Sequence, residues 1–170
     1  FLLCGNGQKN NPTEPPVSLL NTRRTRASIV IGNEGILIMM KIVITGALGY
    51  LGTELCKLYS GESRFKNIVA VDNRFVSGRV SQLRDWGVDF VQASILDEET
   101  IKEIVSDADV VIHLAGITDV AYTKTESNLE QDTLIRNTAI RGTRNIINNI
   151  TDDCKLIFPS THVVYEGFEE

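Results

Sequence analysis

The sequence predicts an α/β fold in which a doubly wound parallel sheet, with strand order 3-2-1-4-5, carries helices on both faces. Two observations lead to this prediction. Short apolar runs alternate with segments of helical periodicity, which is typical of βαβ units whose parallel strands are buried on both sides. The first of these runs also leads directly into a glycine-rich turn and a helix. Both observations lie beyond residue 39, so the organised domain is predicted to span residues 40–170.

The individual elements follow from composition and period. Five strand candidates are rich in β-branched residues: Ile42–Thr45, Ile68–Val71, Val88–Gln92, Val110–Leu114 and Lys155–Phe158. Between them lie four helix candidates: Tyr50–Tyr59, Gly78–Trp86, Glu98–Val105 and Glu126–Ile150. In the last helix, small or apolar residues recur every three or four positions: Ile135, Ala139, Thr143, Ile146 and Ile150. That spacing predicts one helical stripe that faces the core.

Residues 1–39 form a separate part of the chain. They mix Asn, Pro, Gly and Arg without a sustained period of 2 or 3.6, and Pro12, Pro15 and Pro16 exclude a helix there. We expect Met39 or Met40 to be the natural start and the preceding stretch to be non-native sequence. A disordered N-terminal arm is the alternative. Neither interpretation assigns a catalytic or binding role to residues 1–39.

The composition is that of a globular protein. The chain has 170 residues, of which 42% are hydrophobic and 23% charged, so collagen-like, low-complexity and wholly disordered classes are excluded. The net charge of −5 divides into +2 for residues 1–39 and −7 for the remainder. A domain this acidic lacks the basic face that nucleic acid requires, so no nucleic-acid partner is predicted.

The cysteines and the hydropathy pattern concern metal binding and location. Cys4, Cys56 and Cys154 are an odd number without metal-ligand or redox spacing, so neither a metal site nor a disulfide framework is predicted. Cys56 and Cys154 are interpreted as small buried hydrophobic residues.

No run of about 18 apolar residues occurs in the sequence, so no membrane partner is expected and the predicted location is the cytoplasm.

The glycine-rich turn has the spacing of a pyrophosphate-binding loop. Gly46, Gly49 and Gly52 lie three residues apart, directly after a strand and at the start of a helix. Gly46 would permit the tight turn, Gly49 would let the backbone approach phosphates, and Gly52 would let the helix pack closely. The N–H groups of Tyr50 and Leu51 would then face the anion at the positive end of the helix dipole.

A carboxylate follows at the position where a dinucleotide requires one. Asp72 ends the second strand twenty residues after Gly52, where it would accept hydrogen bonds from both hydroxyls of an adenosine ribose. A carboxylate there would repel a 2′-phosphate, so NAD is favoured over NADP. Arg74 and Arg79 keep NADP open as the alternative cofactor.

Three motifs together resemble a known family: the loop Thr45–Gly52, the triplet Val71-Asp72-Asn73 and the stretch His113-Leu114-Ala115-Gly116. The combination resembles the extended short-chain dehydrogenase/reductases, and within them the NAD-dependent epimerase/dehydratase branch to which UDP-glucose 4-epimerase belongs. The resemblance covers residues 41–168. It implies a C-terminally truncated Rossmann fold that binds NAD and lacks the small substrate lobe.

The resemblance implies contacts for individual residues. Tyr50 and Leu51 meet the pyrophosphate, and Asp72 and Asn73 meet the adenosine ribose. Ser94 and Ile95, which follow the third strand, meet adenine, although the family usually has Asp in place of Ser94. Further implied contacts follow the fourth strand or lie on the long helix: Leu114, Ala115, Gly116, Thr118 and Thr138.

Some positions depart from the family pattern or have a structural interpretation. Thr118 stands where some epimerases have Lys, and Ala139 and Thr138 stand at the two places where the family usually has an Asn, the nearest Asn here being Asn137. One residue rotates a helix by about 100 degrees, so Asn137 does not simply replace it. His113 is interpreted as a packed core residue, and Asp97 as the N-cap of the following helix.

Thr161 is the candidate catalytic residue. It lies after the fifth strand in a stretch that resembles Ser-Ser-x-x-Val-Tyr-Gly of the family, where a hydroxyl donates to the reacting substrate oxygen. The family also uses a Tyr and, four residues later, a Lys for proton transfer. No such pair follows Thr161, so we expect the 170-residue chain alone to be inactive. Thr161-His162-Val163 replaces the Thr-Asp-Glu of sugar dehydratases, which disfavours water elimination.

These features predict an NAD-dependent nucleotide-sugar epimerase or related oxidoreductase that moves a hydride between a sugar carbon and the nicotinamide. The implied partners are a nucleotide-sugar substrate and, for the whole protein, a second copy in a homodimer. The alternative is a non-catalytic dinucleotide-binding redox sensor or scaffold with the same fold. A Tyr-x-x-x-Lys motif beyond residue 170 would favour the enzyme.

Overall fold

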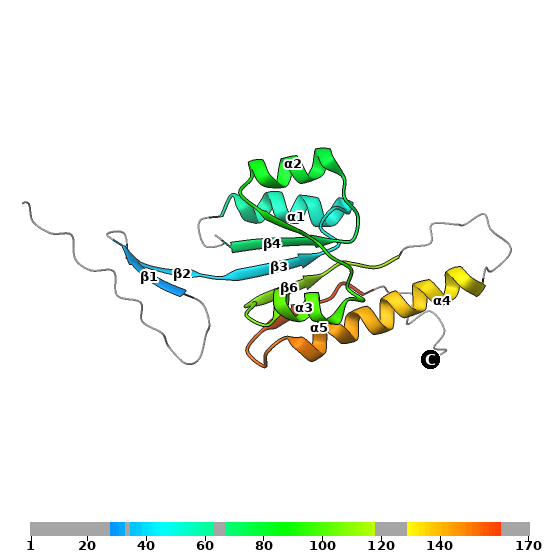
Figure 1. The fold of residues 1–170 in the computed structure, drawn as a ribbon. Helices are drawn as coiled ribbons and strands as arrows, with labels where there is room; N and C mark the ends of the chain where they lie inside the picture. The colour runs from blue at the N-terminus through cyan, green and yellow to red at the C-terminus, as the bar shows by residue number, and fades with distance from the viewer. Residues whose placement is uncertain (1–27, 33–34, 63–66, 118–128, 161–170) are drawn as a thin grey trace, which may run out of the picture.

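The computed structural model of the protein describes residues 28–32, 35–62, 67–117 and 129–160 (Figure 1). Its centre is a five-stranded parallel sheet with the order β5-β4-β3-β6-β7. The strands are β3 (Lys41–Thr45), β4 (Asn67–Asp72), β5 (Asp89–Gln92), β6 (Val110–His113) and β7 (Lys155–Ile157). Counted from β3, the order is 3-2-1-4-5, so the predicted Rossmann topology is confirmed, and each strand end lies within one residue of its prediction.

Helices cover both faces of the sheet because its central strands are apolar on both sides. Figure 1 shows α1 (Tyr50–Ser60) and α2 (Ser77–Asp85) on one face, with α3 (Glu98–Val105) and α5 (Thr143–Asn149) on the other. Alternate residues of β3 point to opposite faces. Ile44 packs in the core cluster that contains residues of α1 and α2, whereas Val43 packs with Ile101 and Ile146. Each fully buried side chain of this kind contributes about 1.5–3 kcal/mol.

The long C-terminal helix is not one regular α-helix. It consists of α4 (Leu129–Asn137), a π-helical turn η1 (Thr138–Gly142) and α5. The predicted core stripe is confirmed at Ile146, which is fully buried, but it is wrong at Ala139, which is exposed. A π turn accommodates one extra residue, so the inward positions before and after it are out of step. Gly142 is buried there instead.

The stretch before β3 contains a β-hairpin that the sequence analysis did not predict. β1 (Ser28–Gly32) and β2 (Gly35–Met39) pair antiparallel, with Val30 opposite Leu37. The sequence analysis excluded a helix around the prolines and proposed no strand in this stretch. Both runs are apolar without alternation, so no period of 2 marked them, although their β-branched residues favour strands. The non-native origin of residues 1–39 stays a prediction.

The predictions for the N-cap of α3 and for the two cysteines have different outcomes. Asp97 caps α3 as predicted, since its Oδ1 accepts a hydrogen bond from the Thr100 N–H at 3.3 Å. Cys56 is a free, fully buried thiol, as predicted, and burial raises its pKa to about 12. Cys154 is free but only half-buried, because it follows the end of α5 rather than facing the centre of the sheet. None of the helices in the described ranges is long and apolar enough to cross a bilayer.

Candidate functional site

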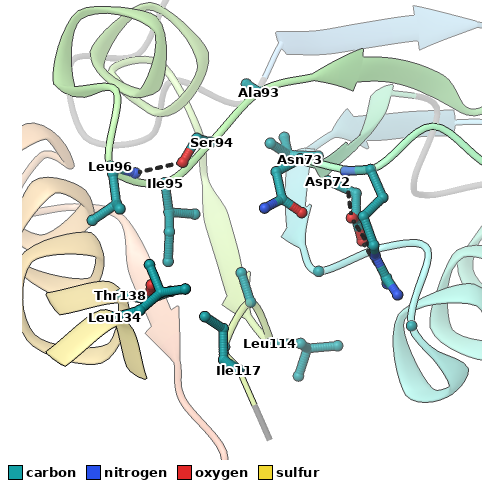
Figure 2. Close-up of a pocket in the computed structure, with 16 residues that line it drawn as sticks. Asp72, Asn73, Ala93, Ser94, Ile95, Leu96, Leu114, Ile117, Leu134 and Thr138 are labelled. Carbon is teal, nitrogen blue, oxygen red and sulfur yellow. Dashed lines mark hydrogen bonds and ion pairs between the residues drawn. The ribbon is translucent and has the colours of Figure 1, made fainter. Parts of the chain in front are cut away.

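A cavity of about 750 Å³ lies at the carboxyl ends of the central strands, where parallel sheets bind dinucleotides (Figure 2). Ten of the residues proposed from the sequence line it: Gly46, Gly49, Asp72, Asn73, Ser94, Ile95, Leu114, Ala115, Gly116 and Thr138. Six further residues complete the wall: Val71, Arg74, Ala93, Leu96, Ile117 and Leu134. Segments that are far apart in the sequence are therefore brought to one site.

The glycine loop is too tightly packed to carry side chains at its outer two glycines. Gly46 has φ +70°, and a Cβ on it would lie 2.8 Å from the Ala115 nitrogen. A Cβ on Gly52 would overlap the Gly46 carbonyl oxygen, so α1 can lie against the loop only without that side chain. Gly49 has an ordinary φ of −73°, and its Cβ would lie 3.1 Å from the same oxygen. The need for glycine at position 49 thus concerns space rather than backbone strain.

The first turn of α1 presents backbone donors beside this loop. Gly49 is the N-cap and makes no side-chain cap hydrogen bond, and the Thr53 N–H is bonded to the Gly49 carbonyl at 3.0 Å. The N–H groups between them belong to the open end of the helix. Tyr50 and Leu51 have exposed side chains and, like Gly52, are not part of the cavity wall. The structure thus brings Gly46 and Gly49 into the cavity wall but leaves these three predicted residues beside it.

Asp72 is the buried charge of the site. Its side chain is 4% exposed, and its Oδ2 accepts a hydrogen bond from the Leu48 N–H at 3.0 Å. Its Oδ1 accepts from the backbone N–H of Arg74 at 3.0 Å and from the Arg74 Nε at 3.1 Å. The carboxylate raises the pKa of Arg74 above its ordinary value through these contacts. Asn73 is exposed beside it, and its carbonyl accepts from Gln92 Nε2 at 3.3 Å.

The wall after β5 is held by the last helix. Ser94 Oγ accepts a hydrogen bond from the Leu96 N–H at 3.2 Å, which Figure 2 shows at the edge of the cavity. Ile95 is buried, and its carbonyl accepts from Asn145 Nδ2 of α5 at 3.0 Å. A Cβ on Gly142 would overlap the Ile95 side chain. The position of Ile95 in the wall therefore depends on the packing of α5 and η1.

The adjoining part of the wall combines the loop after β6 with the long helix. The Leu114 N–H donates to the Thr45 carbonyl at 3.1 Å, and the Ala115 N–H donates to Thr45 Oγ1 at 3.2 Å. Thr138 of η1 and Leu134, one turn earlier, line the same cavity, as Figure 2 shows. Thr118 and Thr161 lie outside the described residues, so their proposed roles remain predictions.

A buried hydrogen-bonded chain lies directly behind the loop. His113 Nδ1 lies 2.7 Å from Thr45 Oγ1, and its Nε2 lies 3.0 Å from Thr143 Oγ1. His113 is 1% exposed, so its interpretation as a core residue is confirmed, and burial lowers its pKa to about 4. The neutral imidazole therefore ties β3 and β6 to α5. In the described ranges, no group of three or more His, Cys, Asp or Glu residues is placed to hold a metal ion.

Sequence reasoning missed part of the wall for identifiable reasons. Leu134 precedes Thr138 by four residues, so helical spacing from Thr138 was a usable signal. Ile117 directly follows the predicted Gly116, and Arg74 was considered only as a phosphate ligand. Ala93 and Leu96 flank the predicted pair Ser94–Ile95 and carried no signal of their own.

Comparison with known proteins identifies relatives of this arrangement. UDP-N-acetyl-alpha-D-glucosaminuronate decarboxylase of Bacillus cytotoxicus is 32% identical over 128 residues, which are 74% of this chain and 37% of that protein. dTDP-D-glucose 4,6-dehydratase of Dictyostelium discoideum is 27% identical over 143 residues, which are 79% of this chain and 32% of that protein. The chain thus spans less than two fifths of the length of either relative.

A solved structure and a family profile agree with these relatives. UDP-glucose-4-epimerase from Stenotrophomonas maltophila, with bound NAD and formylated UDP-arabinopyranose, has a TM-score of 0.61 and 22% identity, covering 74% of this chain and 38% of that one. These matches confirm the family resemblance drawn from the motifs. The profile described as the 3-beta hydroxysteroid dehydrogenase/isomerase family matches residues 43–168. The chain belongs to this family.

Proposed function

We propose that the cavity binds NAD and that the whole protein is an oxidoreductase or epimerase acting on a nucleotide sugar. The observation that carries the proposal is the buried carboxylate of Asp72 in the same cavity as Gly46 and Gly49, at the carboxyl edge of the sheet. The crowding around those glycines leaves backbone, not side chain, facing the space where phosphates would lie. The relatives named as acting on UDP- and dTDP-sugars support the substrate class.

The proposed contacts follow the wall. The backbone of Gly46, Gly49, Tyr50 and Leu51 would hold the pyrophosphate, while Gly52 keeps α1 close. The ribose and adenine would be held by residues after β4 and β5: Asp72, Asn73, Ser94 and Ile95. The rest of the dinucleotide would lie along the loop after β6 and the long helix: Leu114, Ala115, Gly116, Thr118 and Thr138. The side chains of Leu114, Ile117 and Leu134, which line the cavity, would exclude water from the nicotinamide.

The chemistry divides between cofactor and chain. NAD supplies a hydride acceptor or donor when it is bound. The Thr161 hydroxyl would donate a hydrogen bond to the substrate oxygen at the carbon that is oxidised or reduced.

The free thiols of Cys56 and Cys154 fit our proposal of a cytoplasmic protein. By resemblance to its family, the whole protein would be a homodimer.

The test is a titration of the whole protein with NADH, followed by fluorescence. We expect saturable binding that Asp72→Ala weakens by at least about tenfold, since hydrogen bonds to a charged group are worth about 1.5–3 kcal/mol. Asp85→Ala removes an exposed carboxylate at the end of α2 and is the matched control, expected to leave affinity unchanged. A folded protein that does not bind, or an unaltered affinity in Asp72→Ala, overturns the proposal.

A further inference from the structure

The carboxylate of Asp72 is already saturated by the chain. A carboxylate offers about four lone-pair positions. The Leu48 N–H at 3.0 Å and the Arg74 Nη2 at 3.4 Å reach Oδ2, and the Arg74 N–H at 3.0 Å and Nε at 3.1 Å reach Oδ1. A ribose diol that donates to Asp72 must therefore displace one of these donors.

Only one of the donors is free to leave. The Leu48 and Arg74 N–H groups are fixed by the glycine loop and by the end of β4. The Arg74 guanidinium is different, because its side chain is 60% exposed while that of Asp72 is 4% exposed. The guanidinium can therefore leave toward solvent while both backbone donors stay on the carboxylate, and a ribose hydroxyl can take the position that it vacates.

We propose that Arg74 is a specificity-determining residue of the dinucleotide site, whose guanidinium occupies the ribose face of Asp72 and lies beside the 2′-position once displaced. The inference rests on the proposed function. In this arrangement Arg74 competes with the ribose of NAD, and it offsets the repulsion between Asp72 and the 2′-phosphate of NADP. A guanidinium fork suits this role because it binds phosphate oxygens in a bidentate manner.

The surroundings favour an anion at the same place. The first turn of α2 contains no acidic residue, and its Arg79 donates from Nη1 to the Leu48 carbonyl in the glycine loop. Arg79 is therefore anchored and adds positive charge without leaving. The Arg74 guanidinium, in contrast, contacts only Asp72 within the part of the chain that the structure describes. Its position therefore depends on that one carboxylate.

The test compares NAD and NADP affinities of the whole protein, wild type and Arg74→Ala, by calorimetry. We expect Arg74→Ala to bind NAD about two- to fivefold more tightly, because the guanidinium no longer competes with the ribose for hydrogen bonds to the Asp72 carboxylate. NADP should bind about tenfold or more weakly, because a charge-assisted phosphate contact is lost. Arg84→Ala, in the last turn of α2, removes the same charge from an exposed position and should change both affinities less than about twofold.

Two further arms keep the outcomes separate. Arg74→Lys retains the charge without the fork and should recover part of the NADP affinity. If circular dichroism shows that Arg74→Ala is not folded, Arg74→Lys replaces it in the comparison of NAD and NADP affinities. An equal loss of both affinities, or an unchanged ratio in a folded variant, overturns the role of Arg74 and leaves the proposed function intact. A folded wild type that binds neither cofactor overturns the proposed function and this inference together.

Discussion

The two halves of the cavity are built in different ways. The loop half consists of residues 46–49 and 71–74, which follow the neighbouring strands β3 and β4 and are connected by backbone groups, such as the Ala47 N–H bonded to the Val71 carbonyl at 3.1 Å. The far half combines residues 93–96, 114–117 and 134–142, and it depends on side-chain contacts such as that between Gly142 and Ile95. The loop half is therefore built on the backbone of two paired strands, whereas the far half also depends on how the helices pack.

The largest expected effect concerns the packing of the loop half. Gly46→Ala combines a left-handed φ of +70° with a Cβ 2.8 Å from the Ala115 nitrogen, so we expect the free energy of unfolding to fall by about 3–4 kcal/mol. Gly87→Ala is the matched control, because Gly87 has φ +72° but open space around it. It should cost only about 1–2 kcal/mol in urea denaturation. Equal losses would show that the loop tolerates the added methyl group.

The next effect separates ligand space from stability in the same half. Gly49→Val should abolish measurable NADH binding, because its side chain would occupy the position proposed for the pyrophosphate. Its φ of −73° is accessible to valine, but the added Cβ would lie 3.1 Å from the Gly46 carbonyl oxygen, so the free energy of unfolding should fall by about 1–2 kcal/mol, less than in Gly46→Ala. Binding is followed by fluorescence titration and stability by urea denaturation. Normal NADH affinity in the folded variant would show that the phosphates lie elsewhere.

A third prediction concerns the connection between the halves, the chain Thr45–His113–Thr143. The pKa of His113 is about 4 when folded and near 6.5 when unfolded, so the unfolded chain binds the proton more readily between these values. Stability should therefore be constant above pH 7 and fall by about 2–3 kcal/mol as the pH falls from 6.5 to 4. Urea denaturation across this range tests it. His113→Gln should remove this part of the slope, and a slope that persists unchanged would exclude His113 as its source.

Sequence reasoning succeeded where local chemistry decided the structure. Gly46 and Asp72 were predictable because a tight turn after a strand needs a positive φ and because strand ends meet at one sheet edge. Ala139 was placed wrongly because nothing in a period of 3.6 reveals a π turn such as that at Thr138–Gly142. The pairing of Arg74 with Asp72 was equally hidden, because it depends on a bend directly after β4 that leaves no periodic signal in the sequence.

The smallest expected effect tests the far half through Gly142. Gly142→Ala adds a methyl group that would overlap Ile95, while Gly78→Ala adds the same group to α2 in open space. Gly78→Ala should stabilise the protein by about 0.5–1 kcal/mol through helix propensity. Gly142→Ala should destabilise it by about 1 kcal/mol, because overpacking outweighs that gain. It should also weaken NADH binding, since Ile95 lines the cavity and a shift of its side chain changes the wall. Equal stabilisation by Gly142→Ala and Gly78→Ala would contradict this prediction. It would show that packing against Gly142 does not fix the position of Ile95, and that the far half of the cavity does not depend on the long helix.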